Sequence, residues 1–384
     1  SWNRDIVDRP TYGTDFSAAP KVTNEGPTKL FSVAWRWNPA PTLTNELRGG
    51  FNKSPALFAT SQEFPEFLLG GLVYSYPINN FRAQGRQTNT YNLMDNASHM
   101  RGKHNIQFGF QSQMIRTAPF NDAGITPTYN LGISSANPNG LKAAQFPGGI
   151  GTTDLNAANN LLATLAGYIS NSTQTFNVRD RDSGFVPGYT NVRNFSLDNH
   201  AFYVQDTWKV TPRFTAVVGL RYEYFTRLDE RDALMLLPEL VNNNPVHTLL
   251  GNSTVNFAGG KAGRPWYDRD LNNFGPNIGL AYDVFGDGKT AVRAGYSISY
   301  VNDETITSIR NNVNTNSGLT QTATQAGLAA RVSVGRPEVP APAFKVPLTF
   351  ADNYRVSTSA AAGLPDPHLR TPYVQQWSIG IQQE

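Results

Sequence analysis

The stretch HAFYVQDTWKVTPRFTAVVGLRYE, residues 200–223, contains two amphipathic segments separated by a short turn. In the second segment, large apolar side chains alternate with small or polar ones. The two sets are Phe214, Ala216, Val218, Leu220, Tyr222 and Tyr224 against Thr215, Val217, Gly219, Arg221 and Glu223. Because successive side chains of a strand point to opposite faces, this period of two predicts a strand with one apolar and one polar face.

The same alternation recurs along the chain. In the first such segment Phe31, Val33, Trp35 and Trp37 share one face, while Ser32, Ala34, Arg36 and Asn38 share the other. We predict nine strands, at about residues 30–38, 42–51, 87–98, 104–117, 195–209, 213–228, 278–284, 292–300 and 372–383. Most are as long as a membrane-spanning strand, which needs about 9–11 residues, whereas strands of soluble proteins are most often about 5–6 residues long.

The connections between these segments alternate in length. The short turns are residues 37–43, 99–104, 210–214 and 285–290, and the long polar connections are about 52–86, 118–194, 229–273 and 302–371. Tight turns on one rim and long loops on the other are typical of an outer-membrane β-barrel, which has short periplasmic turns and long extracellular loops. The predicted fold is therefore all-β, an antiparallel up-and-down transmembrane barrel.

The composition limits the classes of partner and site. Hydrophobic residues make up 39% and charged residues 16% of the 384, and the formal net charge is +3. This charge is too small to indicate a nucleic-acid partner, and the absence of cysteine excludes disulfides and thiolate metal sites. The most apolar run, residues 161–169, is far shorter than the ~18 residues of a transmembrane helix candidate. Without a visible signal peptide at Ser1, we expect a processed chain or an internal piece.

The aromatic residues and the long loops allow further predictions. Trp and Tyr gather near the predicted strand ends, which indicates the aromatic girdles of a membrane interface, although aromatics also favour strands in general. Within the loops, residues 154–170 predict a short helix with Asp154 as its N-cap, and residues 303–312 predict a helical turn. The Pro-rich stretch 335–347 is expected to be extended.

No catalytic, cofactor-binding or metal-binding residue is predicted, and no cofactor. His99 and His104 flank a turn, but no metal-ligand spacing such as H-E-x-x-H occurs. The acidic clusters 180–184 and 229–232 contain arginines, so we expect local ion pairs rather than calcium sites. The FGDGK turn lacks the spacing of a P-loop. Seven charged residues are predicted to face a polar lumen and to pair with one another or with a plug domain: Arg36, Glu46, Arg48, Lys209, Arg221, Glu223 and Arg293.

Four segments resemble one family. Residues 200–223, quoted above, resemble a recurring hairpin of Oar-like TonB-dependent receptors, and RGKHNIQFGF at 101–110 resembles a turn and strand of the same family. GKTAVRAGYSISY at 288–300 and PYVQQWSIGIQQE at 372–384 are similar to its barrel strands.

The resemblance implies an outer-membrane transport protein of a Gram-negative bacterium, and not an enzyme. Its partners would be outer-membrane lipid, the TonB complex and an imported substrate that the sequence does not identify. The family's plug and N-terminal regulatory-like domains are not recognisable, and its barrels have about 22 strands, an even number as in bacterial single-chain barrels. Residues 1–384 are therefore predicted to be part of such a barrel domain, with substrate contacts in loops 118–194, 229–273 and 302–371.

Two other hypotheses remain at this point: a soluble, secreted β-rich binding or adhesion protein, and a secreted β-rich hydrolase. The direction of the apolar faces separates them from a membrane protein. A barrel wall exposes these faces as a continuous band about 25 Å tall, whereas a soluble monomer rarely exposes large apolar patches. An enzyme would also need a pocket with converging titratable groups.

Overall fold

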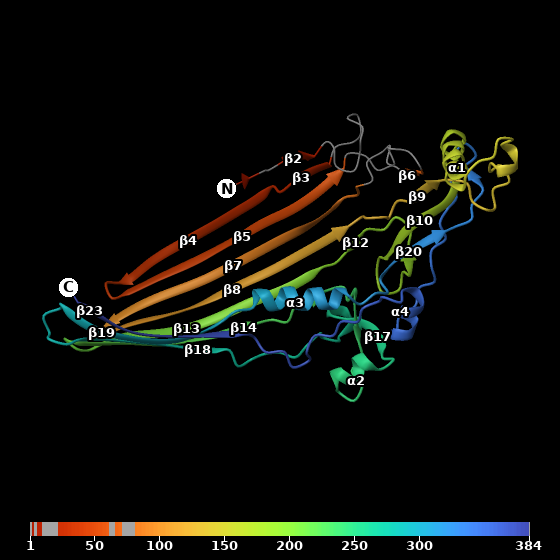
Figure 1. The fold of residues 1–384 in the computed structure, drawn as a ribbon. Helices are drawn as coiled ribbons and strands as arrows, with labels where there is room; N and C mark the ends of the chain where they lie inside the picture. The colour runs from red at the N-terminus through yellow and green to blue at the C-terminus, as the bar shows by residue number, and fades with distance from the viewer. Residues whose placement is uncertain (1, 4–5, 10–21, 61–65, 71–80, 384) are drawn as a thin grey trace.

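One large antiparallel sheet dominates the computed structural model, which describes residues 2–3, 6–9, 22–60, 66–70 and 81–383 (Figure 1). Its principal path follows the strand order β1, β4, β5, β7, β8, β13, β14, β18, β19, β23. Their bounds are Trp2–Asn3, Thr28–Ala40, Leu43–Thr60, Gln84–Arg101, His104–Asn121, Phe195–Thr211, Phe214–Phe225, Phe274–Asp283, Thr290–Tyr300 and Tyr373–Gln383. Each predicted strand falls on one of the nine longer strands of this path. The sheet is not closed, since no pairing joins β23 to β1 in the part of the chain described.

Four short strands extend the sheet at its upper end, which is the end where the long connections begin. They are β2 (Ile6–Arg9), β3 (Val22–Glu25), β12 (Asn191–Val192) and β15 (Asp229–Glu230). β3 pairs with β5, β12 with β8, and β15 with β13, so the wall continues beyond the length of a membrane-spanning strand.

The four predicted tight turns are confirmed. They join β4 to β5, β7 to β8, β13 to β14 and β18 to β19, and all lie at one end of the sheet (Figure 1). In the FGDGK turn, the Asp283 carboxylate accepts hydrogen bonds from the Gly286 and Gly288 N–H groups at 2.9 and 3.0 Å. Both glycines have positive φ, 77° and 76°, a conformation that glycine adopts without steric cost.

Strand pairing places the predicted apolar sets on one face, here called the outer face. Trp35 lies opposite Leu47 across β4 and β5, and Phe202 lies opposite both Phe110 and Tyr222. Outer-face side chains are well exposed, with Trp35 at 60% and Val218 at 57%. A soluble sandwich would bury them against a second layer, so the alternative of a soluble fold is wrong for this sheet.

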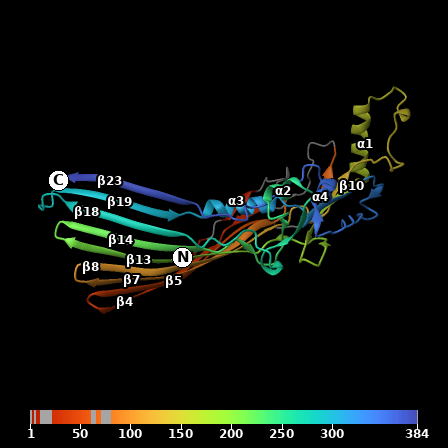
Figure 2. The ribbon, with the colours of Figure 1, turned by 90° about the horizontal axis from the view of Figure 1, so that it is seen from below.

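The opposite face, here called the inner face, is the concave side of the curved sheet. Figures 1 and 2 show the helix α3 (Asp303–Asn314) lying within this curve. Phe195 and Leu197 on the inner face of β13 pack in one cluster with Ile309 and Val313 of α3. The upper part of the concavity is therefore filled by the chain's own loops.

The long connections form a folded layer at the end opposite the turns (Figure 1). One of its sheets contains β6 (Glu66–Leu69), β9 (Thr128–Leu131), β10 (Tyr168–Val178), β11 (Phe185–Val186), β20 (Thr320–Gln325) and β21 (Ala330–Arg331). The other contains β16 (Met235–Pro238), β17 (Thr254–Ala258) and β22 (Leu348–Thr349). Besides α3, the layer holds α1 (Thr152–Ala166), α2 (Pro245–Leu250), α4 (Phe350–Val356) and the short 3₁₀ helices η1 (Ala143–Gln145) and η2 (Gly260–Ala262).

Two predictions for the loop helices need correction. The first helix is shorter than 154–170, because Gly167 ends it in the left-handed conformation with φ 70° and β10 begins at Tyr168. Asp154 is not the N-cap, which is Gly151, but lies in the first turn, where a negative charge is favourable. The predicted helical turn at 303–312 is confirmed as α3, and residues 335–347 contain no helix or strand. None of the described helices is long and apolar enough to cross a membrane.

Candidate functional site

The inner face carries the charged residues that the sequence placed in a lumen. Arg36 and Arg48 both bind Glu46, with nitrogen–oxygen distances of 2.6 Å to its two carboxylate oxygens. Farther along the sheet, Arg221 Nε lies 2.8 Å from Glu223 Oε1. The predicted pairing is thus confirmed for these five residues. The remaining two, Lys209 and Arg293, have no ion-pair partner in the described chain, so their pairing with a plug domain stays a prediction.

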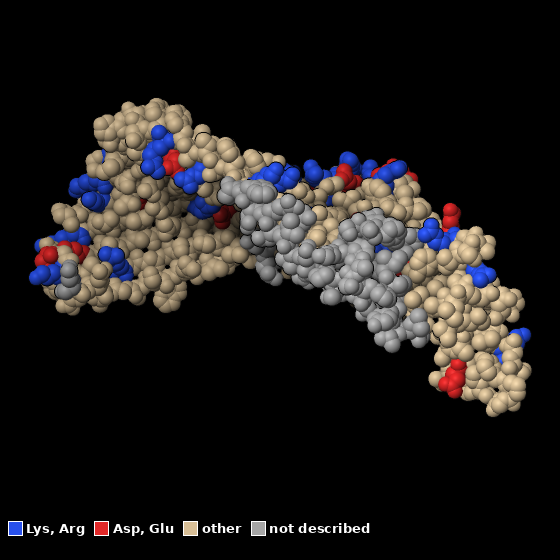
Figure 3. Space-filling view, turned by 90° about the horizontal axis from the view of Figure 1, so that it is seen from above, with Lys and Arg blue, Asp and Glu red and all other residues tan. Residues whose placement is uncertain are grey.

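Neutral hydrogen-bonding side chains occupy much of the inner face between these ion pairs. The Tyr203 hydroxyl donates to Asn96 Oδ1 at 2.8 Å across two strands, and Asn277 donates to Gln205 Oε1 at 2.9 Å. Hollows of about 600 and 390 Å³ lie on either side of Tyr203, both with mixed polar and apolar linings. In Figure 3 the charged side chains form small groups on a broad uncharged surface. Water can solvate this face, and its side chains can form hydrogen bonds with a polar solute.

A further cavity of about 570 Å³ lies between the loop layer and the upper end of the inner face. It is bordered by the end of β8, by β16, by the C-terminal end of α3 and by the start of β20. Asparagines are frequent in its lining: Asn121, Asn191, Asn311, Asn314 and Asn316. Asn316 is structural, because its amide binds the backbone of Leu236 and Gly363.

Arg193 and Arg310 are the charged side chains among the described residues that line this cavity. Arg193 donates from Nη1 to the Val192 carbonyl at 2.7 Å, and Arg310 donates to Asn311 at 3.4 Å. Neither forms an ion pair in the described structure. Burial lowers the pKa of Arg193, which the charge of Glu230 partly offsets, but an arginine keeps its proton in proteins. The cavity therefore has positive potential and donor groups for an anionic or oxygen-rich ligand.

Glu230 does not line this cavity but binds the backbone at or next to two lining residues, Arg193 and Leu234. Its side chain is fully buried and accepts hydrogen bonds from the backbone N–H of Asn194 at 2.7 Å and of Leu234 at 2.6 Å. Burial raises the pKa of Glu230, while these N–H groups act in the opposite direction. Because it bridges the entry to β13 and the approach to β16, Glu230 fixes the position of Arg193 relative to β16.

The acidic clusters are held by ion pairs, but the partners differ in part from those expected. Asp180 pairs with Arg179 at 3.2 Å, as local pairing predicts. Asp232 pairs instead with Lys261 at 2.8 Å and also accepts from Asn194, not from the neighbouring arginine. The Lys261 hydrogen bond, as the largest cause, lowers the pKa of Asp232. The cluster therefore joins three separate stretches of the loop layer.

Sequence reasoning missed several residues that hold the loop layer. Arg264 donates to four backbone carbonyls, those of Phe257, Pro238, Leu237 and Asn256. Burial raises the pKa of Tyr267 to about 12, and its hydroxyl accepts from the Leu228 N–H at 2.8 Å. Asp270 binds Arg370 and the Thr371 N–H across 100 residues of sequence. A local pattern contains no signal for partners this distant.

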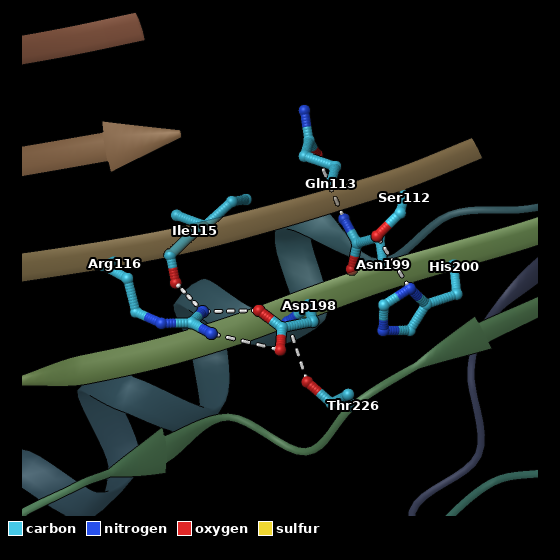
Figure 4. Close-up of polar contacts among 8 residues, drawn as sticks. All are labelled: Ser112, Gln113, Ile115, Arg116, Asp198, Asn199, His200 and Thr226. Atoms are coloured by element: carbon cyan, nitrogen blue, oxygen red, sulfur yellow. Dashed lines mark hydrogen bonds and ion pairs between the residues drawn. The ribbon is translucent and has the colours of Figure 1, made fainter. Parts of the chain in front are cut away.

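Figure 4 shows a polar cluster near the upper end of β8 and β13. The Arg116 guanidinium binds both carboxylate oxygens of Asp198, and the Asp198 N–H donates to the Thr226 hydroxyl at 2.7 Å. His200 Nδ1 lies 3.0 Å from the Ser112 hydroxyl. At the other end of these strands, His104 Nδ1 lies 2.6 Å from Asp206, and its ring stacks on Trp208. His99 is not part of that contact, and no group of three potential metal ligands occurs in the described part of the chain.

Comparison with known proteins gives one match over the whole chain. A family model described as "Outer membrane beta barrel domain" matches residues 1–384. No curated protein sequence matches.

Among solved structures, the chain is similar to the outer membrane transporter YddB from Escherichia coli, with 12% identity, a TM-score of 0.43 and coverage of 84% of this chain and 31% of that one. The chain is also similar to the siderophore receptor PiuA from Acinetobacter baumannii, with 8% identity, a TM-score of 0.36 and coverage of 98% of this chain and 41% of that one. A third similar structure is P. aeruginosa FpvA bound to heterologous pyoverdines, with 11% identity, a TM-score of 0.26 and coverage of 74% of this chain and 39% of that one. The chain spans less than half the length of each.

Proposed function

We propose that this protein transports a substrate across the outer membrane. The chain belongs to the outer membrane beta-barrel domain family and is located in the outer membrane. We infer that it is part of the barrel wall of an Oar-like TonB-dependent receptor, one of about 22 strands when complete. The four sequence segments that resemble this subfamily support the finer assignment. The role would be uptake of a substrate and not enzymatic catalysis.

The separation of the two faces of the sheet carries this proposal. The outer face exposes Phe31, Trp35 and Val218, as a wall in contact with lipid must. The inner face presents the paired Arg36 and Glu46 and a network of amides and hydroxyls. A polar solute could pass along such a face without losing all its hydrogen bonds, because the wall offers replacements.

The proposed mechanism has two stages. A substrate first binds at the extracellular loops and the plug domain of the receptor, and TonB then pulls on the plug with energy from the inner-membrane proton gradient. The barrel supplies a fixed polar channel and forms no covalent bond with the substrate. The unpaired Lys209 and Arg293 on the inner face would be available to contact the plug.

The loop-layer cavity is the candidate place for substrate contact within this chain. Neither Arg193 nor Arg310 forms an ion pair in the described structure, so a ligand with negative charge or many oxygens would complete their hydrogen bonding. The cavity lies in the region of the predicted contact loops 118–194 and 302–371. Arg193 is held by β12 and Glu230, whereas Arg310 extends from α3.

Uptake by living cells tests the function. A strain lacking the protein is compared with wild type for accumulation of labelled ferric siderophores, cobalamin and oligosaccharides, with and without a protonophore. We expect one ligand to depend on both the protein and the proton gradient. Uptake that is unchanged by the protonophore would indicate a passive pore and contradict the proposal.

The cavity is tested by the double variant R193Q/R310Q. Loss of two charged donors is expected to weaken binding of that ligand by about tenfold or more. The matched control is R179Q/R181Q, which removes two arginines from a part of the loops outside the cavity. Equal binding by wild type and R193Q/R310Q would exclude the cavity as the contact site.

A further inference from the structure

Four polar residues form a row across neighbouring strands on the outer face. Lys29 of β4 lies opposite Lys53 of β5, Lys53 opposite Asn89 of β7, and Asn89 opposite Arg116 of β8. We call these residues the basic row. With strands about 4.8 Å apart, the row extends over about 14 Å of the outer face.

The two lysines of the basic row have no counter-ion among the described residues. Lys29 and Lys53 are exposed, and neither forms an ion pair or a side-chain hydrogen bond in the described structure. Directly opposite residues on one face have Cβ atoms only about 5 Å apart, so two positive charges there repel each other. Arg116 differs, because Asp198 already pairs with it. An arrangement that places unpaired like charges side by side indicates an anion that is not part of this chain.

The position of the row indicates where that anion is located. The next row toward the turns is aromatic and apolar: Phe31 opposite Phe51, and Phe51 opposite Tyr91. Phe31 and Phe51 stack with their ring centres 5.9 Å apart, and all three side chains are at least 40% exposed. On β4, the apolar face continues from there to Trp37, beside the turn.

The membrane boundary can be placed from these dimensions. Eleven residues separate Lys29 from Ala40, the last residue of β4 beside the turn, which is about 36 Å along a strand and about 26 Å along the membrane normal at a tilt near 45°. This agrees with the band of about 25 Å that lipid covers on such walls. Since the tight turns are periplasmic and the long loops extracellular, the basic row lies at the headgroup level of the outer leaflet.

We propose that the basic row binds the phosphate groups of the glycolipid of the outer leaflet, lipopolysaccharide. Lys29 and Lys53 contact a phosphate, and the Asn89 amide, whose Oδ1 is occupied by Gln87 at 3.0 Å, donates from its free Nδ2. The aromatic row beneath packs against the acyl chains. This site is on the opposite face of the sheet from the transport path, and it depends on the membrane location but not on the proposed substrate uptake.

Binding of purified lipopolysaccharide to the intact protein in detergent tests the site. Each lysine is expected to contribute about fivefold, so K29Q/K53Q should bind about 30-fold more weakly and each single variant about fivefold. K29R/K53R keeps both charges and should bind as wild type. The control K103Q/K289Q removes two lysines at the periplasmic turns and should also bind as wild type.

Three probes separate the possible ligands. Lipopolysaccharide stripped of its phosphates should bind wild type as weakly as the intact lipid binds K29Q/K53Q, while phosphatidylglycerol vesicles and inorganic phosphate should not displace the intact lipid. Equal binding by K29Q/K53Q and wild type would overturn the proposal. Displacement by phosphatidylglycerol or by inorganic phosphate would also overturn it, in favour of a general anionic-lipid or free-ion site. If the double glutamine variant does not fold, the single variants decide.

Discussion

Glu230 shows how much one buried residue determines in the loop layer. Its carboxylate accepts two backbone N–H groups, and glutamine can replace only one of these acceptors because its other atom is itself a donor. We expect E230Q to destabilise the loop layer by about 1–3 kcal/mol, the cost of leaving a buried donor unpaired. Hydrogen exchange of peptides from residues 226–273 measures this, and E239Q, at an exposed carboxylate, is the control.

The pH dependence of the same residue follows from its raised pKa. A carboxyl group whose pKa is higher in the folded than in the unfolded state favours folding most when it is protonated. The stabilisation that Glu230 adds to the folded state is complete at a pH below its ordinary pKa of 4.5, and it declines as the pH rises through the raised pKa of the folded state. Exchange protection of the loop layer should therefore decrease over that window in wild type and not in E230Q. Protection that increases with pH in wild type would contradict this account.

Individual residue roles could be predicted only where the partner is close in sequence or in register. Arg36 and Glu46 were predictable, because alternation places both on the inner face of adjacent strands joined by a tight turn. Arg264 and Asp270 were not, because their partners depend on how long loops fold over one another. Arg193 has no sequence signal either, since its role follows from a cavity that four distant segments border.

At the scale of the strand, the outer face must tolerate lipid and the inner face water. L220R places an arginine on the outer face of β14 beside Val204, and should cost about 2–4 kcal/mol where the site lies near the middle of the membrane. V217R places the same side chain on the inner face, where water solvates it, and should cost less than about 1 kcal/mol. Urea unfolding from lipid vesicles provides both values. Equal costs at the two positions would contradict the assignment of the faces.

The strands of the wall were predictable because their signal is local and repeated. Each one alternates over many residues, and the turns between them are short, so pairing and register follow from the chain itself. The loop strands were not predicted. β10 is buried on much of both faces, and β6 pairs with β9 in parallel, which no hairpin signal reveals. The end of α1 was misplaced because Gly167 stops the helix within an apolar run.

For the molecule as a whole, the two ends of the strands have different structures. The turn end is simple and closely hydrogen-bonded, whereas the loop end contains two additional sheets, buried cores and the cavity beside Arg193. Composition and loop lengths predicted this asymmetry, and the resemblance of four segments supplied the proposed transport class. Neither predicted that the loops fold back over the concave side, with α3 inside the curve (Figure 1).

The central claim is that one face of the sheet contacts lipid and the other faces a polar lumen. Residues 1–384 contain no cysteine, so single cysteines at successive positions 215–222 can each carry the one spin label of this part of the protein. In outer-membrane vesicles, labels at positions 216, 218, 220 and 222 should be accessible to oxygen and shielded from a water-soluble nickel complex, and labels at 215, 217, 219 and 221 should show the reverse. Accessibility without this period of two, or with the opposite phase, would contradict the account.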